Sequence, residues 1–165
     1  MQVLFLSTEW TIGLFFIIWP LLQFAAYAGS APLFDRYLSV RSRLFQAAKW
    51  EQEGAIYNRL FKIRRWKGYL PDGGRIVKKD FNKKTLQSFS KPHLERFLQE
   101  SCRAELSHWF AITPFWVFGL FAPPKAIFYM LIYALAVNLP CIMAQRYNRP
   151  RVIRLLARMD GSKQL

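Results

Sequence analysis

The chain has 165 residues, which leaves room for one domain and excludes a multidomain enzyme. Of these residues 53% are hydrophobic and 17% aromatic, yet 24 Lys and Arg stand against 10 Asp and Glu, a net charge of +14. These extremes indicate that apolar and charged residues are segregated along the chain, and the charge predicts a polyanionic partner, either nucleic acid or anionic lipid.

Three apolar stretches are long enough to cross a membrane. The first, residues 11–28, contains no charged residue. Residues 106–144 are too many for one crossing of a hydrocarbon core about 30 Å thick at a rise of about 1.5 Å per residue, so this stretch must turn. Pro123 and Pro124, followed by Lys125, mark the turn. We therefore predict transmembrane helices at about 11–28, 104–122 and 126–144.

The basic residues fix the expected orientation of these spans. Residues 34–103 contain 17 Lys and Arg against 7 acidic residues, and residues 145–165 contain 6 against 1. Short segments rich in Lys and Arg stay cytoplasmic, so the amino terminus is expected outside and both basic segments inside. This predicts an all-α multi-pass protein of the cell membrane, with 1–165 as one membrane domain. The cytoplasmic location of the two basic segments accounts for the net positive charge. Anionic membrane lipids are therefore expected as partners, and nucleic acid is not.

The segments outside the spans show helical periodicity. Apolar residues at 44–48 and 56–63 recur at helix spacing and predict amphipathic interfacial helices on the cytoplasmic side. A Ser-Lys-Pro sequence at 90–92 predicts the start of a helix that can continue into the second span. Residues 151–159 predict a surface helix among head groups, whereas the PDGG sequence at 71–74 predicts a turn.

A first candidate site lies at the start of the second span, in the sequence RAELSHW of residues 103–109. On a helix Glu105 and His108 are three residues apart and share a face. A carboxylate that orients an imidazole forms a general base able to deprotonate a hydroxyl for attack on an acyl carbonyl. The alternative is that Arg103 and Glu105 are juxtamembrane charges and that His108 ends the span in the head-group layer.

A second candidate site ends the third span, in the sequence QRYNRPR of residues 145–151. The cluster combines guanidinium, amide and phenol groups: Gln145, Arg146, Tyr147, Asn148, Arg149 and Arg151. Arginine suits bidentate recognition of phosphate or carboxylate, although an ordinary basic flank of a span has the same composition. The topology places this cluster and RAELSHW at the same membrane depth, so we expect the two to meet beside the turn that carries Lys67 and Asp72.

Other catalytic patterns are not found in the sequence. It has no Gly-rich phosphate loop and no Cys or His pair with metal-ligand spacing, so no metal or cofactor is expected. Cys102 and Cys141 lie near the cytoplasmic ends of different spans, where a structural disulfide is not expected. A juxtamembrane cysteine such as Cys102 is more often inert or lipidated than nucleophilic.

The sequence also resembles a known family. The resemblance rests on WEQEGAIYNRLFKIRRWKGYLPDGG at 50–74 (with Glu51, Gly54, Asn58, Trp66, Lys67, Leu70 and Asp72), on RAELSHW, and on NLPCIMAQRYNRPR at 138–151. In this order the blocks resemble the small membrane glycosyl-diaponeurosporenoate acyltransferases of staphyloxanthin-type carotenoid synthesis, over roughly residues 35–156. The resemblance implies transfer of a fatty acyl group to a sugar hydroxyl of a glycosylated carotenoid or a similar glycolipid.

These observations predict a membrane-bound O-acyltransferase that works without a covalent enzyme intermediate. His108, oriented by Glu105, is the predicted base, and Asp72 is a second candidate base or orienting group. The predicted electrostatic groups that hold the donor and stabilise the oxyanion are Arg103, Lys67, Arg146 and Arg149. Trp66 and Tyr147 are predicted to stack on the sugar.

Two questions stay open at the level of the sequence. The acyl donor is acyl-CoA, acyl carrier protein or a phospholipid, and neither its chain nor the oligomeric state of the protein can be inferred. A non-catalytic lipid-binding scaffold or assembly partner explains the charge equally well. That alternative predicts that Arg151, Arg154 and Arg158 matter more for function than Glu105 or His108.

Overall fold

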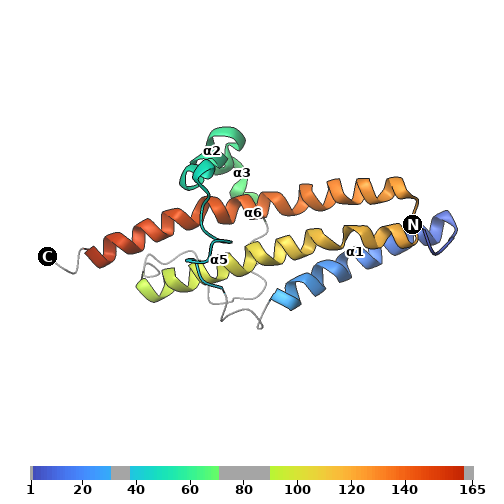
Figure 1. The fold of residues 1–165 in the computed structure, drawn as a ribbon, viewed down its shortest axis with the longest axis horizontal. Coiled ribbons are helices and arrows are strands. Elements are labelled where there is room, and N and C mark those ends of the chain that lie inside the picture. The colour runs from blue at the N-terminus through green and yellow to red at the C-terminus, as the bar shows by residue number, and fades with distance from the viewer. Residues whose placement is uncertain (1, 31–37, 71–89, 162–165) are drawn as a thin grey trace. The chain divides into compact units, whose positions relative to one another are not determined.

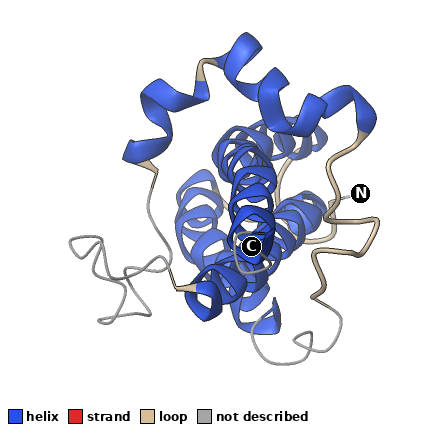
Figure 2. Cartoon of the chain, turned by 90° about the vertical axis from the view of Figure 1, so that its left-hand side faces the viewer, coloured by secondary structure: helices blue, strands red, loops and turns tan. Residues whose placement is uncertain are grey.

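A computed structural model describes residues 2–30, 38–70 and 90–161 of the chain. The regular secondary structure of these residues is helical, and Figure 2 shows no strand among them. The elements, labelled in Figure 1 where there is room, are α1 (Thr8–Ser30), η1 (Lys49–Gly54), α2 (Ala55–Phe61), α3 (Ile63–Trp66), η2 (Lys67–Tyr69), α5 (Lys91–Ile112), η4 (Thr113–Leu120) and α6 (Pro124–Gly161), where η denotes a 3₁₀ helix. The prediction of an all-α protein is confirmed for the described part of the chain.

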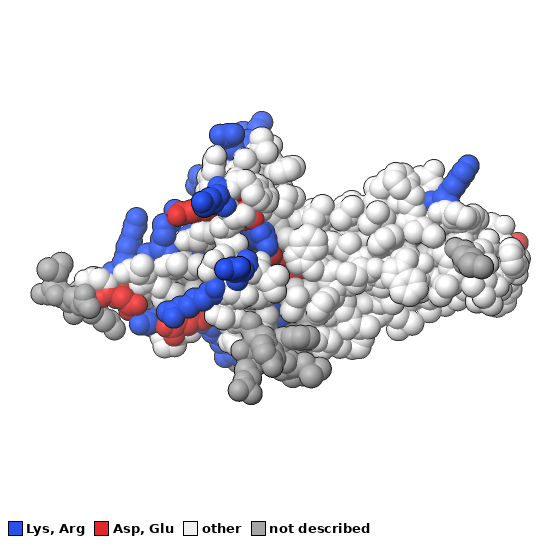
Figure 3. All heavy atoms as spheres, in the orientation of Figure 1, with Lys and Arg blue, Asp and Glu red and all other residues white. Residues whose placement is uncertain are grey.

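The chain divides into two compact units. The first comprises Met1–Phe34 and Glu105–Ile142, and the second comprises Asp35–Ala104 and Met143–Leu165, so α5 and α6 each contribute residues to both. The first unit has only three formally charged residues, Glu9, Glu105 and Lys125, and we call it the apolar unit. The second carries the rest of the charge and is called the basic unit. Figure 3 accordingly shows Lys and Arg atoms gathered over one part of the surface and a broad area without them.

In the apolar unit, α1 packs against the 3₁₀ segment η4. Phe118 is fully buried, and its ring stacks on that of Phe15 with 4.9 Å between centroids. Phe121 and Trp19 complete the aromatic cluster. Gln23 adds a polar contact, because its Nε2 donates a hydrogen bond of 3.2 Å to the carbonyl oxygen of Ala111.

The outer surface of the apolar unit is rich in large hydrophobic side chains. Trp10, Phe16, Phe24, Phe128 and Tyr129 are all more than 60% exposed. An apolar surface of this kind is unfavourable in water and suits contact with lipid. Among the described residues two helices, Thr8–Gly29 and Pro124–Gly161, are long and apolar enough to cross a membrane by length and composition. The structure therefore indicates membrane association.

The predicted second span is not a single α-helix. α5 ends at Ile112, and residues 113–120 form the 3₁₀ segment η4, whose Pro114 departs from helical geometry at φ −82°, ψ 15°. Proline has no amide hydrogen to donate to the preceding turn, which explains the change of helix type at this point. The α-helices predicted for the first and third spans are present in α1 and α6, and α6 begins at Pro124, at the predicted turn.

In the basic unit, α2 and α3 pack on α6. Tyr57 of α2 and Ile63 of α3 form a buried cluster with Ala144 and Tyr147 of α6. Gly54, between η1 and α2, has φ +81°, and a Cβ placed there would lie 2.9 Å from the carbonyl oxygen of Arg146. A glycine is required at this close approach between the two backbones.

Three of the predicted helices outside the spans are confirmed, including α5, which begins at Lys91 as the Ser-Lys-Pro sequence predicts, and one is wrong. α2 covers the periodic stretch after Gly54, and α6 includes residues 151–159. Residues 44–48 form turns and irregular structure instead of a helix, because the carbonyl oxygens of Leu44 and Phe45 accept hydrogen bonds from arginines of α6. The turn predicted at 71–74 lies outside the described residues.

Candidate functional site

In the apolar unit His108 of α5 is hydrogen bonded to Asn138 of α6. His108 Nδ1 lies 2.9 Å from Asn138 Oδ1, and Asn138 Nδ2 donates a bond of 2.9 Å to the carbonyl oxygen of Ala134. Since the amide NH2 is used on Ala134, Oδ1 is the acceptor and Nδ1 of the imidazole carries the proton. The other ring nitrogen, Nε2, is then unprotonated in the neutral imidazole and able to accept a proton.

Asn138 is the group that orients His108 in this structure. Its side chain is 1% exposed, and its own bond to Ala134 on the preceding turn of α6 fixes its direction. Glu105, one turn before His108 on α5, is also buried. Its predicted role as the orienting carboxylate stays a prediction.

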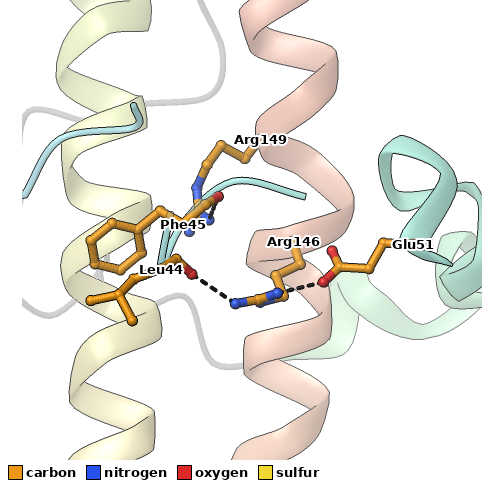
Figure 4. A network of polar contacts seen from close by, with 5 residues as sticks. All are labelled: Leu44, Phe45, Glu51, Arg146 and Arg149. Carbon is orange, nitrogen blue, oxygen red and sulfur yellow. Dashed lines mark hydrogen bonds and ion pairs between the residues drawn. The ribbon is translucent and has the colours of Figure 1, made fainter. Parts of the chain in front are cut away.

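In the basic unit Arg146 of α6 holds two segments from the middle of the chain. It forms an ion pair with Glu51 of η1, and its Nη2 donates a bond of 2.9 Å to the carbonyl oxygen of Leu44 (Figure 4). Glu51 is fully buried, so the pair neutralises a carboxylate that would otherwise be costly to bury. The guanidinium of Arg146 is therefore positioned to stabilise the fold.

Arg149, also on α6, likewise forms hydrogen bonds within the protein. It is 2% exposed; its Nη1 donates a bond of 2.8 Å to the carbonyl oxygen of Phe45, and its Nη2 one of 3.1 Å to that of Ser101. The guanidinium also lies over the Phe45 ring, 5.4 Å from its centroid (Figure 4). These contacts join α5 and the turns before η1 to α6. Binding of a substrate anion by Arg146 or Arg149 stays a prediction.

Three further polar residues of the basic unit lie around Tyr147, which is 4% exposed. Lys67 Nζ lies 4.8 Å from the ring centroid and donates a bond of 2.6 Å to Asn148 Oδ1. Arg151 lies over the same ring at 3.5 Å and donates to the Tyr147 carbonyl oxygen. Two cations therefore contact one buried aromatic ring. We call Lys67, Tyr147, Asn148 and Arg151 the Tyr147 cluster.

The other predicted site residues lie around these groups. Trp66 is half-buried, and its indole N–H donates a bond of 2.7 Å to the carbonyl oxygen of Phe61. Arg103 pairs with Glu100 on the same face of α5 at 2.8 Å, and Gln145 is half-buried. Asp72 lies outside the described residues.

Cysteines and metal ligands add no further chemistry to the described residues. Cys102 and Cys141 are both buried, and neither forms a disulfide within the described part of the chain. In the described part of the chain, no group of three or more His, Cys, Asp or Glu is placed to hold a metal ion.

Sequence reasoning assigned no role to Asn138 or to Glu51, although both lie within the motifs that carry the resemblance. Asn138 could have been noticed as the one amide in the otherwise apolar stretch 126–144. Glu51 gave no local signal, since its partner Arg146 is 95 residues away in the sequence. The expected meeting of RAELSHW with QRYNRPR stays a prediction.

A half-buried imidazole held in one tautomer, on a protein with a lipid-compatible surface, fits the class of membrane enzymes that move a proton from a hydroxyl group. The model of the glycosyl-4,4'-diaponeurosporenoate acyltransferase family matches residues 41–158, and the chain belongs to this family of acyltransferases.

Two curated relatives carry the same name. The one from Staphylococcus haemolyticus is 38% identical over 108 residues, which are 66% of this chain and 63% of the relative. One from a bovine strain of Staphylococcus aureus is 32% identical over 123 residues, 74% of this chain and 73% of the relative. No solved structure matches the chain.

Proposed function

We propose that this protein is a membrane-bound O-acyltransferase that esterifies a sugar hydroxyl of a glycosylated carotenoid, or of a similar glycolipid, with a fatty acyl group. Membership of the acyltransferase family supports the reaction class, and the name of the family supports a glycosylated diaponeurosporenoate as the acceptor. The aligned part covers only 63% of the Staphylococcus haemolyticus relative, so the acceptor is part of the proposal.

The observation that carries the proposal is the hydrogen bond between His108 and Asn138. A neutral imidazole with Nδ1 protonated presents Nε2 as a base. The pair lies in a unit with only three formally charged residues, one of which, Glu105, is one turn before His108 on α5. Polar side chains in such surroundings are costly to bury and are usually retained for function.

The proposed reaction is a direct transfer. His108 Nε2 takes the proton of the sugar hydroxyl as the hydroxyl oxygen forms a bond to the acyl carbonyl carbon. The tetrahedral intermediate then collapses, the bond from carbon to the donor's sulfur or oxygen breaks, and the imidazolium returns the proton to the leaving group. Asn138 accepts from Nδ1 throughout and holds the ring in one tautomer.

Different cations are proposed for different tasks. Arg103 is half-buried and is assigned to stabilise the oxyanion, with Glu105 as an additional orienting group for the base. The Tyr147 cluster is assigned to the acyl donor. Because Tyr147 is almost fully buried and its ring already contacts two cations, we assign stacking on the sugar to Trp66. Asp72 stays a candidate second base.

The proposed topology has three spans, at about 11–28, 104–122 and 126–144. The middle one consists of the end of α5 followed by η4. The amino terminus lies outside, and the basic segments 34–103 and 145–165 lie on the cytoplasmic side, where they contact anionic lipids and activated acyl donors. The exposed aromatic surface of the apolar unit supports the lipid contact that this topology requires.

The experiment compares the only two histidines of the chain, which both lie on α5. Purified protein in detergent receives a labelled acyl donor and a glycosylated carotenoid, and ester formation is followed by chromatography. We expect His108→Ala to lower kcat by about 100-fold or more, the usual contribution of a general base, and His93→Ala to leave it unchanged. Unchanged turnover by His108→Ala would remove the assignment of the base, whereas no ester formation by the wild type would favour a non-catalytic lipid-binding role.

A further inference from the structure

The helices α2 and α3 of the basic unit meet at a sharp corner. α2 ends at Phe61 and α3 begins at Ile63, and between them Lys62 has a left-handed conformation with φ 49° and ψ 40°. The backbone N–H of Lys62 closes the last turn of α2 by donating a bond of 3.1 Å to the carbonyl oxygen of Asn58. A residue with a Cβ rarely adopts this conformation, so the corner is a specific feature of the fold.

The inner face of these two helices is already packed. Tyr57 and Ile63 are buried against Ala144 and Tyr147 of α6, and Trp66 is partly buried beside them. One apolar face of this kind is enough to attach an amphipathic helix to a core.

Further large side chains next to the corner lie outside this core. Leu60 is 61% exposed and Phe61 52%, and Tyr69 of η2 is 88% exposed. Apolar surface of this kind is unfavourable in water when it forms a patch, and it marks an interaction site. The segment therefore requires an apolar partner in addition to α6.

The same segment carries an excess of positive charge. Residues 55–70 contain five Lys and Arg and no Asp or Glu. Arg59, Lys62, Arg64 and Arg65 are exposed, and no ion pair of the described residues involves any of these four. Figure 3 shows Lys and Arg atoms beside uncharged surface where Figure 1 draws α2 and α3. The partner should therefore be anionic as well as apolar.

We propose that the corner between α2 and α3 inserts into the surface of a bilayer that contains anionic phospholipids. The inserting residues, which we call the corner surface, are Arg59, Leu60, Phe61, Lys62, Arg64 and Arg65. The two apolar side chains enter the region where the acyl chains begin, and the four cations contact the phosphates of the head groups. Tyr69 suits the boundary between the two layers, because its ring is apolar and its hydroxyl is polar.

This inference goes beyond the proposed topology. That topology requires only that the basic segments lie on the cytoplasmic side, whereas the corner surface penetrates the leaflet and selects its lipids. Neither property depends on the acyltransferase reaction.

An acidic protein also offers negative charge, but a bilayer fits the corner surface better. The long side chains of Arg and Lys can extend to the phosphates while their apolar neighbours reach deeper, which a bilayer accommodates at every position along its surface. The exposed aromatic side chains of the apolar unit also indicate membrane association of the same chain. A covalently linked basic unit then meets the bilayer at a high effective concentration.

The experiment measures lipid contact at residue 61 in the full-length chain. Phe61→Cys is made in a background of Cys102→Ala and Cys141→Ala, labelled with the fluorophore NBD and reconstituted into vesicles. The vesicles contain equal parts of phosphatidylcholine and phosphatidylglycerol, and a nitroxide quencher is attached to the acyl chain of one lipid or of the other. The membrane charge is the same in both sets, and both leaflets have the same composition, so the orientation of the protein does not affect the comparison.

The control probe is placed at Phe16→Cys. Phe16 is 77% exposed on α1 of the apolar unit, in a helix that contains no Lys or Arg. It therefore reports contact with lipid at a position without cations on its own helix.

We expect NBD at residue 61 to be quenched in both sets, and at least about twofold more strongly by the labelled phosphatidylglycerol, because the cations enrich anionic lipid around the corner. NBD at residue 16 should be quenched equally by both lipids. Absence of quenching at residue 61, with quenching at residue 16, overturns the proposal and favours an acidic protein as the partner. Equal quenching by both lipids at residue 61 also overturns it, because the corner then does not select anionic lipid.

Two sets of variants test the role of the cations. Arg59→Gln, Lys62→Gln, Arg64→Gln and Arg65→Gln, made together, should remove the preference for phosphatidylglycerol while residue 61 is still quenched. Arg59→Lys, Arg64→Lys and Arg65→Lys, made together, keep the charge and should keep the preference, which separates loss of charge from a fold defect. A preference that survives the glutamine replacements would contradict recognition of the lipid by these side chains.

Discussion

Gly54→Ala should destabilise the basic unit through two separate costs. Gly54 has φ +81°, a conformation that costs an L-residue roughly 1–2 kcal/mol. The added Cβ would also lie 2.9 Å from the carbonyl oxygen of Arg146 and 3.1 Å from Cα of Tyr147, both backbone atoms of α6 that cannot move independently. Overpacking of this kind costs about 1–3 kcal/mol, so the total loss of unfolding free energy is about 2–5 kcal/mol. At the sensitivity of a domain of this size, Tm should fall by at least about 4 °C.

The assay uses a buried thiol of the same unit. Cys102 is fully buried, and in a Cys141→Ala background it is the only thiol of the chain, so a fluorogenic maleimide added during heating reports its exposure. Gly68→Ala is the control, because a Cβ at Gly68 meets no atom within 4 Å. If Gly54→Ala and Gly68→Ala unfold at the same temperature, the close approach of η1 and α6 is not as described.

Two further predictions concern the base and the topology. Asn138→Leu removes the acceptor of the His108 Nδ1 proton. It should lower kcat by about 10- to 100-fold with little change in KM, the usual effect of losing an orienting partner. The control Val137→Leu, at an exposed position one residue away, should leave kcat unchanged. Equal kcat values for the two variants would contradict the assigned role. In a protein without its native cysteines, Lys125→Cys should react with a membrane-impermeant maleimide in intact cells, and Arg158→Cys only after permeabilisation. The reverse pattern would contradict the proposed orientation.

The long helices could be predicted because their signal is local. α1 and α6 are visible as apolar runs, and the start of α5 is visible in the Ser-Lys-Pro sequence at 90–92. The predicted helix at 44–48 failed for the opposite reason. Its apolar spacing is correct for a helix, but the carbonyl oxygens of Leu44 and Phe45 are taken by guanidiniums more than 100 residues away, which local periodicity cannot reveal.

The residues of the candidate site likewise divide into those with a local sequence signal and those identified only by long-range contacts. His108 was identifiable as a titratable group at the end of an apolar stretch, and its neighbour Glu105 was the natural partner to predict from spacing alone. The partner in the structure, Asn138, lies 30 residues away on another helix. Pairing across helices depends on how α5 and α6 pack, so an orienting group of this kind needs the structure to be found.

The motifs that carry the family resemblance therefore contain two kinds of residue: residues that stabilise the fold and residues proposed for the reaction. Glu51 and Gly54 from the first block contact Arg146 and Tyr147 from the last, one through an ion pair and the other through backbone packing. These contacts give residues of the two blocks a shared structural role in the basic unit. A motif residue whose donors are satisfied within the protein is better assigned to the fold than to the reaction. Arg149 has both terminal nitrogens bonded to backbone carbonyl oxygens, and these two bonds contribute to the framework of the basic unit. The proposed reaction depends instead on a different kind of motif residue, His108, whose Nε2 is the proposed base because Nδ1 donates to Asn138.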